Sequence, residues 1–329
     1  MARSTGKQQN SRHGIGGKYG GMNMIEINNI KYIGIDHGYG SIKTANTITP
    51  NGIIVSDKKP TFRSDYICLN EKYYTFTDSV KSFISDKTAD DDYYAATLLG
   101  IAKELRLKNI CEADVYLAAG LPLTWINAQS GEFTKYLMRS NDVNFSFNGK
   151  QYAVHFVGCK IYPQGYAAVI DRLHGMTGTN LVADIGNATI NIMYINNKKA
   201  VPTKLYTEKM GVTQCIIAAE NAVMNNFGVK ADRMTIENVI RYGNENISQK
   251  YLDCINAAVS EYACKILDVL KKYEYDPEMM KLYVCGGGQN ILRNYLGEKL
   301  SNTEYITDIK ANAKGYELLL HEAMRRGIL

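Results

Sequence analysis

The chain has 329 residues, of which 45% are hydrophobic and 22% are charged, and its formal net charge is +5. This length exceeds what one compact core usually organises and predicts two domains of roughly 150 residues each. The composition predicts a soluble protein, because no apolar run approaches the roughly 20 residues that a membrane-spanning helix needs.

The positive charge is concentrated at the start of the chain. Four cations precede the first acidic residue, Glu26, so removing them from the total of +5 leaves only +1. A surface that binds DNA directly is therefore not expected. The four cations are Arg3, Lys7, Arg12 and Lys18.

Residues 1–24 are rich in Gly, Ser and Lys or Arg, and they lack the apolar stretch of a secretory signal. They cannot bury enough apolar surface to offset the entropy of ordering, so we expect a disordered tail. This tail is either vector-derived, with Met22 or Met24 as the native start, or a functional basic segment. The seven cysteines are scattered, odd in number and without zinc-ligand spacing, which predicts reduced, mostly buried thiols in a cytoplasmic protein.

From Ile25 onward the chain alternates strand and helix patterns, and its strands are nearly continuous apolar runs. Such runs are typical of strands covered on both faces, so the predicted class is α/β. Predicted strands are 32–35, 115–118, 181–184, 190–195 and 281–284. Predicted helices are 212–227 before Gly228, 249–273, and 313–326 before Gly327. The acidic triplet Asp90-Asp91-Asp92 favours a helix N-terminus over a metal site.

A short internal repeat is the most informative feature. IGIDHGYGSIKTA from Ile33 aligns with LVADIGNATINIM from Leu181 when Asp36 is placed over Asp184, about 148 residues later. Each copy predicts a strand that ends in an aspartate, a glycine-containing turn and an antiparallel return. Such turns direct backbone N–H groups at an anion. Two of them facing across a cleft would hold one nucleotide, with both aspartates binding Mg²⁺ through water.

A third glycine-rich element follows the predicted strand 281–284. Gly286, Gly287 and Gly288 stand in a row before a helix-like segment that starts at Gln289. Consecutive glycines allow a backbone to lie flat against a ring or a phosphate. A flexible turn, the structural alternative, would rarely need three.

The order of these elements resembles the actin, heat-shock chaperone and sugar kinase superfamily, and most of all the ParM-type actin-like ATPases that segregate plasmids. The resemblance covers residues 30 to 320. It implies a duplicated, ribonuclease H-like two-domain fold with a nucleotide cleft between the domains. The expected domains are residues 25–165 with 306–329, and residues 166–305. The matching segments are 36–43, 120–123, 162–167, 183–187 and 311–315.

The resemblance also implies roles for individual residues. Gln164 would orient the water that attacks the γ-phosphorus, and Lys43 would lie beside the β-phosphate. Asp36 and Asp184 would be catalytic and would hold Mg²⁺ through water. Gly38, Tyr39, Gly40, Ser41, Gly186, Asn187 and Ala188 would clamp the phosphates, while Gly211, Gly286, Gly287, Gly288 and Gln289 would line the adenosine site.

Three residues need separate interpretation. Asn191 stands where many relatives carry an acid, which leaves Mg²⁺ to the two aspartates. His37, placed in the first turn, is expected to pack beside the site and not to act as a general base. For Gln164 the structural alternative is a polar residue at a helix start after Pro163.

The function implied by the resemblance is ATP hydrolysis, or GTP hydrolysis, coupled to head-to-tail polymerisation that segregates plasmid or mobile-element DNA. The implied partners are further copies of the chain and a small DNA-binding adaptor of the ParR type on a centromere-like site, with no direct membrane contact. The alternatives are a cytoskeletal scaffold without DNA cargo and a small-molecule kinase, although no sugar-pocket base is evident.

Overall fold

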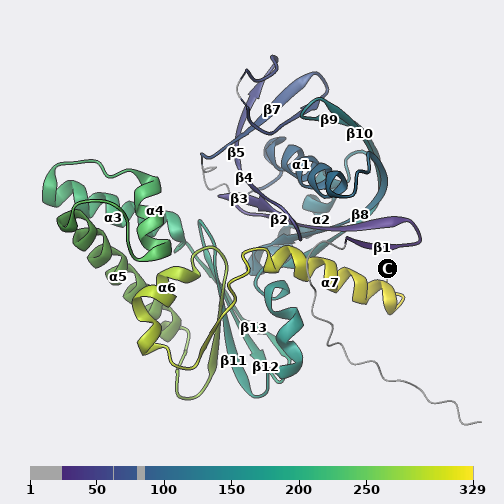
Figure 1. The fold of residues 1–329 in the computed structure, drawn as a ribbon. Helices are drawn as coiled ribbons and strands as arrows, with labels where there is room; N and C mark the ends of the chain where they lie inside the picture. Colours follow the sequence, from purple (N-terminus) through teal and green to yellow (C-terminus); the bar gives the residue numbers. More distant parts are fainter. Residues whose placement is uncertain (1–23, 62, 80–85, 329) are drawn as a thin grey trace, which may run out of the picture.

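The computed structural model describes residues 24–61, 63–79 and 86–328. The predicted N-terminal tail lies outside these residues except at Met24, which packs against the first core. Two mixed sheets organise the described chain, and the helix nearest the C-terminus lies between them (Figure 1).

The first sheet has ten strands in the order β4-β3-β2-β8-β10-β9-β6-β7-β5, with β1 paired to β2. The pairs β2–β8 and β8–β10 are parallel, whereas the others are antiparallel. The strands are β1 Ile25–Ile27, β2 Ile30–His37, β3 Ser41–Lys43, β4 Ile48–Pro50, β5 Gly52–Ser56, β6 Tyr66–Leu69, β7 Lys72–Thr77, β8 Glu112–Leu121, β9 Asp142–Phe147 and β10 Lys150–Pro163.

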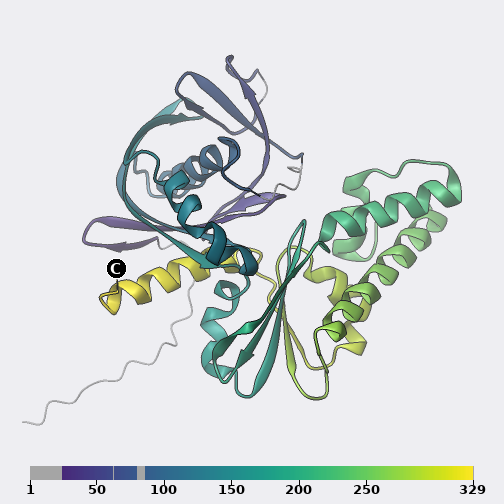
Figure 2. The same cartoon turned by 180° about the vertical axis from the view of Figure 1, so that it is seen from behind.

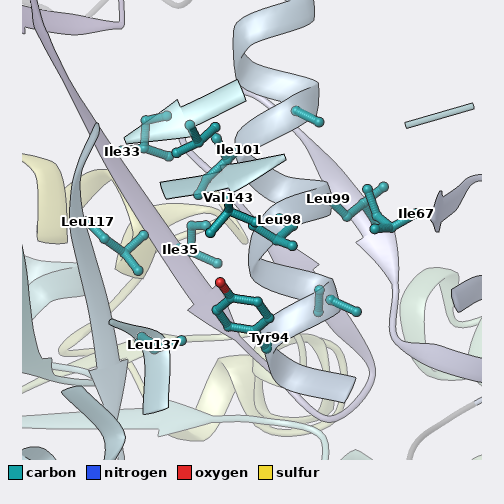
Figure 3. Close-up of a cluster of buried hydrophobic side chains, with 14 of the residues drawn as sticks. Ile33, Ile35, Ile67, Tyr94, Leu98, Leu99, Ile101, Leu117, Leu137 and Val143 are labelled. Carbon is teal, nitrogen blue, oxygen red and sulfur yellow. The ribbon is translucent and has the colours of Figure 1, made fainter. Parts of the chain in front are cut away.

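This sheet curves around helix α1 (Asp92–Leu107), which begins at the acidic triplet as predicted. Ile33 and Ile35 of β2 face Leu98 of α1 in a core that is closed to solvent (Figure 3). Burying such side chains contributes roughly 25 cal/mol per Å² of apolar surface, so this helix is held mainly by packing. The 3₁₀ turn η1 (Leu123–Trp125) and helix α2 (Ile126–Leu137) follow β8.

The second sheet has the order β13-β12-β11-β14-β15. Its strands are β11 Thr179–Ile185, β12 Ile190–Asn196, β13 Lys199–Glu208, β14 Lys281–Cys285 and β15 Thr303–Tyr305. Helices α3 (Val212–Phe227), α4 (Arg233–Tyr242), α5 (Gln249–Lys272) and α6 (Gln289–Leu296) lie to one side, and the 3₁₀ segment η2 (Ala167–Gly175) lies on the other (Figure 2). Leu181 faces the helices whereas Val182 faces η2, so both faces of β11 are buried as predicted.

Helix α7 (Ala311–Arg325) returns from the second sheet and packs on β2, β8 and η2. Two glycines allow its backbone to approach. A Cβ at Gly34 would lie 2.1 Å from the Ala313 oxygen, and one at Gly315 would lie 1.9 Å from the Ala167 oxygen. The 3₁₀ turn η3 (Gly297–Lys299) completes the elements of the described chain.

The predicted strands and helices are confirmed, with α7 starting two residues before the predicted position. All seven cysteines are free, but the expectation that most are buried is wrong. Cys215 and Cys285 are buried and the other five are half-buried.

Candidate nucleotide and magnesium site

The two aligned repeats form hairpins with the same closing hydrogen bond. In the first, β2 and β3, the Gly38 N–H donates to the Ser41 oxygen at 3.2 Å. In the second, β11 and β12, the Gly186 N–H donates to the Thr189 oxygen at 2.8 Å. The alignment paired these same residues, so the repeat in the sequence corresponds to a repeated local structure.

The two turns contact each other. A Cβ built on Gly40 would lie 3.2 Å from Nδ2 of Asn187, so a side chain at position 40 would press on the Asn187 amide of the second turn. The Asn187 Nδ2 is buried and has no hydrogen-bond partner within the described part of the chain. A buried amide donor without a partner is costly, which makes this group a fitting ligand for a phosphate oxygen.

Asp36 is the second-last residue of strand β2 and is only 5% exposed. Its Oδ2 accepts from Lys43 Nζ at 3.2 Å, across the first hairpin, where the strand register pairs the two residues. Its Oδ1 accepts from Gln164 Nε2 at 3.0 Å. Gln164 follows β10 and is fixed by its own N–H, which donates to the Leu121 oxygen at 2.9 Å. The predicted metal ligand, lysine and water-orienting residue therefore lie together.

Asp184 is the second-last residue of strand β11 and is also 5% exposed. Its Oδ2 accepts from Asn312 Nδ2 of α7 at 2.9 Å. Burial raises the pKa of the Asp184 carboxyl, the Asn312 bond opposes that rise, and the nearby charge of Asp36 adds to it. The two aspartates are thus close enough to repel each other.

This pair of carboxylates fits a hydrated Mg²⁺ ion. Mg²⁺ is usually held by one or two carboxylates together with substrate phosphates and water, and a divalent charge would offset the repulsion between Asp36 and Asp184. No group of three or more His, Cys, Asp or Glu side chains forms a metal site among residues 24–61, 63–79 and 86–328. An ion here would therefore need phosphate oxygens to complete its coordination.

The glycines predicted to line the adenosine site surround the second hairpin. Gly286 has φ +84°, and a Cβ there would lie 2.4 Å from Asp184 Oδ1. The Gly288 N–H donates to the Ile185 oxygen at 2.9 Å. Gly211 is the N-cap residue directly before α3, and a Cβ there would lie 2.4 Å from the Asn187 oxygen.

Three further predicted residues differ in exposure. Gly287 has open space at its Cβ position, whereas Gln289 is 3% exposed, and its Oε1 has no partner within the described chain. Tyr39 is buried beside the first turn, and burial raises the pKa of its hydroxyl. Gly287 is thus the open member of the glycine row.

His37 lies in strand β2 and not in the turn where the sequence placed it, because the strand extends through residue 37. Its ring is fully buried, with Nε2 2.7 Å from Thr97 Oγ1 of α1. Thr97 donates to the Tyr93 oxygen, so its Oγ1 accepts from the histidine. Burial, together with the charge of Lys87, keeps the pKa of His37 well below its usual range. The ring packs in the core against Tyr93 and Phe133.

Lys87 was not found from the sequence. Its side chain is 2% exposed, and its Nζ donates to the His37 oxygen at 2.8 Å, directly before the first turn. Burial lowers the pKa of Lys87 to about 8, against an opposing effect of Asp36. No motif or spacing marks this lysine, since it enters the site from a loop distant in sequence. The role of Asn312 was also missed, although its segment carried the resemblance.

Asn191 pairs with Asp184 in the strand register and bonds away from it. Its Oδ1 accepts from Thr207 Oγ1 at 2.9 Å, and Thr207 is 3.1 Å from Thr124 Oγ1 of η1. Asn191, which stands where many relatives carry an acid, thus takes part in a polar contact between the second sheet and η1.

Known proteins resemble both halves of the chain. Residues 34–166 match the family model for the N-terminal domain of actin-like proteins, and residues 182–298 match that for the C-terminal part of the archaeal, MreB-like actin homologue. A search of curated protein sequences gave no match.

Solved structures with similar folds cover most of this chain. The archaeal actin homologue Ta0583 in complex with ADP has a TM-score of 0.70 at 16% identity, covering 88% of this chain and 99% of that chain. The apo pSK41 ParM protein has 0.69 at 15%, covering 92% and 100%. A 15-stranded ParM filament from Clostridium botulinum has 0.66 at 18%, covering 88% and 99%.

These matches confirm the predicted fold class: an actin-like, two-domain α/β fold with two mixed sheets. In the part of the chain that the structure describes, no helix is both long and apolar enough to cross a membrane.

Proposed function

We propose that this actin-like protein is an ATPase that polymerises head to tail and thereby separates copies of plasmid or mobile-element DNA. The observation that carries the proposal is the pair of hairpins that hold Asp36 and Asp184 directly before their turns and approach each other at Gly40 and Asn187. A nucleotide triphosphate is the ligand class that needs anion-binding turns from two sides and a metal between them.

ATP would lie with its phosphates between the two turns and its adenosine against Gly211 and Gly286–Gly288. Backbone N–H groups of residues 39–41 and 187–188, together with Lys43, would neutralise the phosphates, because the Gly38 and Gly186 N–H groups already close the two hairpins. Asp36 and Asp184 would hold Mg²⁺ through water, and the ion would supply charge compensation for the leaving diphosphate. GTP remains an alternative nucleotide, since glycines alone do not select a base.

Hydrolysis would depend on positioning and not on a covalent nucleophile. Gln164 would orient a water whose oxygen attacks the γ-phosphorus while the bond to the ADP oxygen breaks. Its Nε2 is fixed by Asp36, so its amide oxygen is the group that can accept from the water.

Head-to-tail contacts are heterologous and extend as filaments when they do not close into a ring. The ParM filament from Clostridium botulinum, whose fold is similar, supports assembly of this kind. Most of the chain's excess positive charge lies in residues 1–24, so the rest of the chain carries little net charge with which to bind DNA. A small DNA-binding adaptor of the ParR type would therefore join filament ends to DNA in the cytoplasm. The similarity to an archaeal actin homologue makes a cytoskeletal filament without DNA cargo the second candidate.

Light scattering and phosphate release, measured with purified protein, Mg²⁺ and ATP, test the proposal. We expect polymer to form and then decay as phosphate appears. Asp184→Ala should abolish hydrolysis, whereas Gln164→Ala should slow it and prolong the polymer. Phosphate release without scattering would exclude a filament, and normal hydrolysis by Gln164→Ala would exclude its proposed role. Co-sedimentation with an adaptor and its DNA site separates the two candidates.

A further inference from the structure

We propose that Asn312 is a positioning residue that couples the two halves of the nucleotide site. Its side chain links Gly165 to Asp184 in a hydrogen-bonded path that runs from Asp36 through Gln164 and Gly165 to Asn312 and Asp184. The inference rests on the proposed nucleotide site, but it assigns a role to a residue of α7, a helix outside both hairpins.

Each step of this path has ordinary hydrogen-bond geometry. Gln164 Nε2 donates to Asp36 Oδ1 at 3.0 Å, and the peptide unit that follows presents the Gly165 N–H. That N–H donates to Asn312 Oδ1 at 2.9 Å. The amide nitrogen of Asn312 then donates to Asp184 Oδ2 at 2.9 Å. The path thus joins the aspartates of both repeats.

The amide at position 312 is suited to this place because it offers one acceptor and one donor. Its oxygen accepts a hydrogen bond from the Gly165 N–H, and its nitrogen donates one to the Asp184 carboxylate, so both polar atoms of the side chain have a partner. Aspartate would keep the acceptor but place a second carboxylate against Asp184. Alanine would leave the Gly165 N–H and Asp184 without their partner.

The surroundings prevent this segment from moving freely. Asn312 is 7% exposed, and Gly165 has φ +78° with its Cβ position 3.3 Å from Asp184 Cβ. One turn further along α7, the contact of Gly315 with the Ala167 backbone fixes the helix against η2. A displacement of Asp184 is therefore transmitted to Gly165, and through it to Gln164.

The consequence for catalysis is joint positioning. The group proposed to orient water and the aspartate proposed to hold hydrated Mg²⁺ lie on different sheets, yet Asn312 keeps them at a fixed separation. Losing this link should disturb the alignment needed for hydrolysis more than it disturbs nucleotide binding, which the hairpin turns provide.

The first test compares Asn312→Ala, Asn312→Asp and the control Asn180→Ala in the full chain. Asn180 is a buried asparagine on the same strand as Asp184, and its Nδ2 donates to the Thr177 and Gly178 oxygens away from the site. We expect the kcat of Asn312→Ala to fall about tenfold or more, with its Kd for a non-hydrolysable ATP analogue within about threefold of wild type. The control should keep its kcat.

The second test is a double-mutant cycle with Gln164→Ala. If Asn312 acts through Gln164, the double variant should lose clearly less kcat than the product of the two single losses. Independent, multiplicative losses would overturn the inference.

Exchange of the Gly165 amide, followed by NMR of glycine-labelled protein, gives a readout without nucleotide. The exchange rate should rise in Asn312→Ala and stay low in Asn312→Asp, because aspartate keeps the acceptor for the Gly165 N–H. The aspartate variant also provides the test if the alanine variant does not fold. Unchanged exchange in Asn312→Ala, or exchange in Asn312→Asp as fast as in the alanine variant, would overturn the path. If wild type binds no nucleotide, the proposed function fails; if wild type hydrolyses ATP and Asn312→Ala equals it, only this inference fails.

Discussion

Glu317 of helix α7 is a buried acid whose replacement by glutamine should stabilise the protein at neutral pH. The side chain is 5% exposed, and its Oε1 accepts from the Gly34 N–H at 3.0 Å. Burial raises its pKa from 4.5 to about 8, and the charge of Glu104 adds to the rise, while the Gly34 bond and Lys314 oppose it. Folding therefore keeps a proton on this carboxyl that the unfolded chain releases.

The sign of the pH dependence follows from this difference. Between pH 4.5 and pH 8 the folded protein binds one proton more than the unfolded chain, so stability falls as pH rises. Each pKa unit corresponds to about 1.4 kcal/mol, which gives a loss of about 3 kcal/mol between pH 4.5 and pH 7. Glutamine resembles the protonated acid and keeps the acceptor for Gly34, so Glu317→Gln should avoid this loss.

The assay is urea unfolding of wild type and Glu317→Gln at several pH values between 5 and 8. We expect the variant's advantage in unfolding free energy to grow by about 1.4 kcal/mol for each pH unit. Glu132→Gln, which removes an exposed carboxylate from α2, is the control and should run parallel to wild type. Parallel profiles for Glu317→Gln and wild type would refute the reasoning, because they would mean that Glu317 is ionised in the folded protein.

Three further substitutions test the site and its frame. Lys87→Met should weaken binding of a non-hydrolysable ATP analogue about tenfold in calorimetry, because the His37 carbonyl before the first turn loses its cationic partner. The control is Lys103→Met, which removes a lysine paired with Asp65. Equal weakening of binding in this control would contradict the role of Lys87. Gly286→Ala should destabilise the free protein in thermal melts, since its φ is +84° and a Cβ would meet a carboxylate oxygen at 2.4 Å. Gly287→Ala is the control, because a Cβ there has open space, and it should melt at the same temperature as wild type. An equal fall in melting temperature in both variants would show that the contact at Gly286 does not cause the destabilisation. Gly131 lies at an exposed position of α2, and no atom lies within 4 Å of a Cβ built there. Gly131→Ala should therefore raise the unfolding free energy by about 0.5–1 kcal/mol in urea titrations. No gain would mean that α2 frays at this position.

Local patterns predicted the elements of the fold well. The apolar runs around Asp36 and Asp184 indicated strands covered on both faces, and α3 ends at Gly228, which has φ +66°, as a glycine after an apolar stripe predicts. The repeat located both hairpins because a turn needs glycine at fixed positions. These features depend on neighbours in sequence, which a single chain displays.

The parts of the site that were missed depend on contacts between distant segments. Lys87 reaches the His37 carbonyl from a loop, and Asn312 reaches Asp184 from the helix nearest the C-terminus. Segment 311–315 carried the resemblance, but nothing in it showed that Asn312 contacts Asp184. His37 was placed in the turn because strand ends shift by a residue or two, and only packing against α1 fixes that boundary. Tertiary contacts of this kind leave no local signal.

Helix α7 packs against β2 and β8, although more than 180 residues separate it from the end of β8 in the chain. During synthesis, the faces of β2 and β8 that contact α7 stay uncovered until residues 311–325 leave the ribosome. At about 5–20 residues per second, this delay lasts on the order of 10 s or more. The nascent chain therefore exposes an apolar strand surface throughout that interval, and a chaperone bound there would have to leave before the last helix docks.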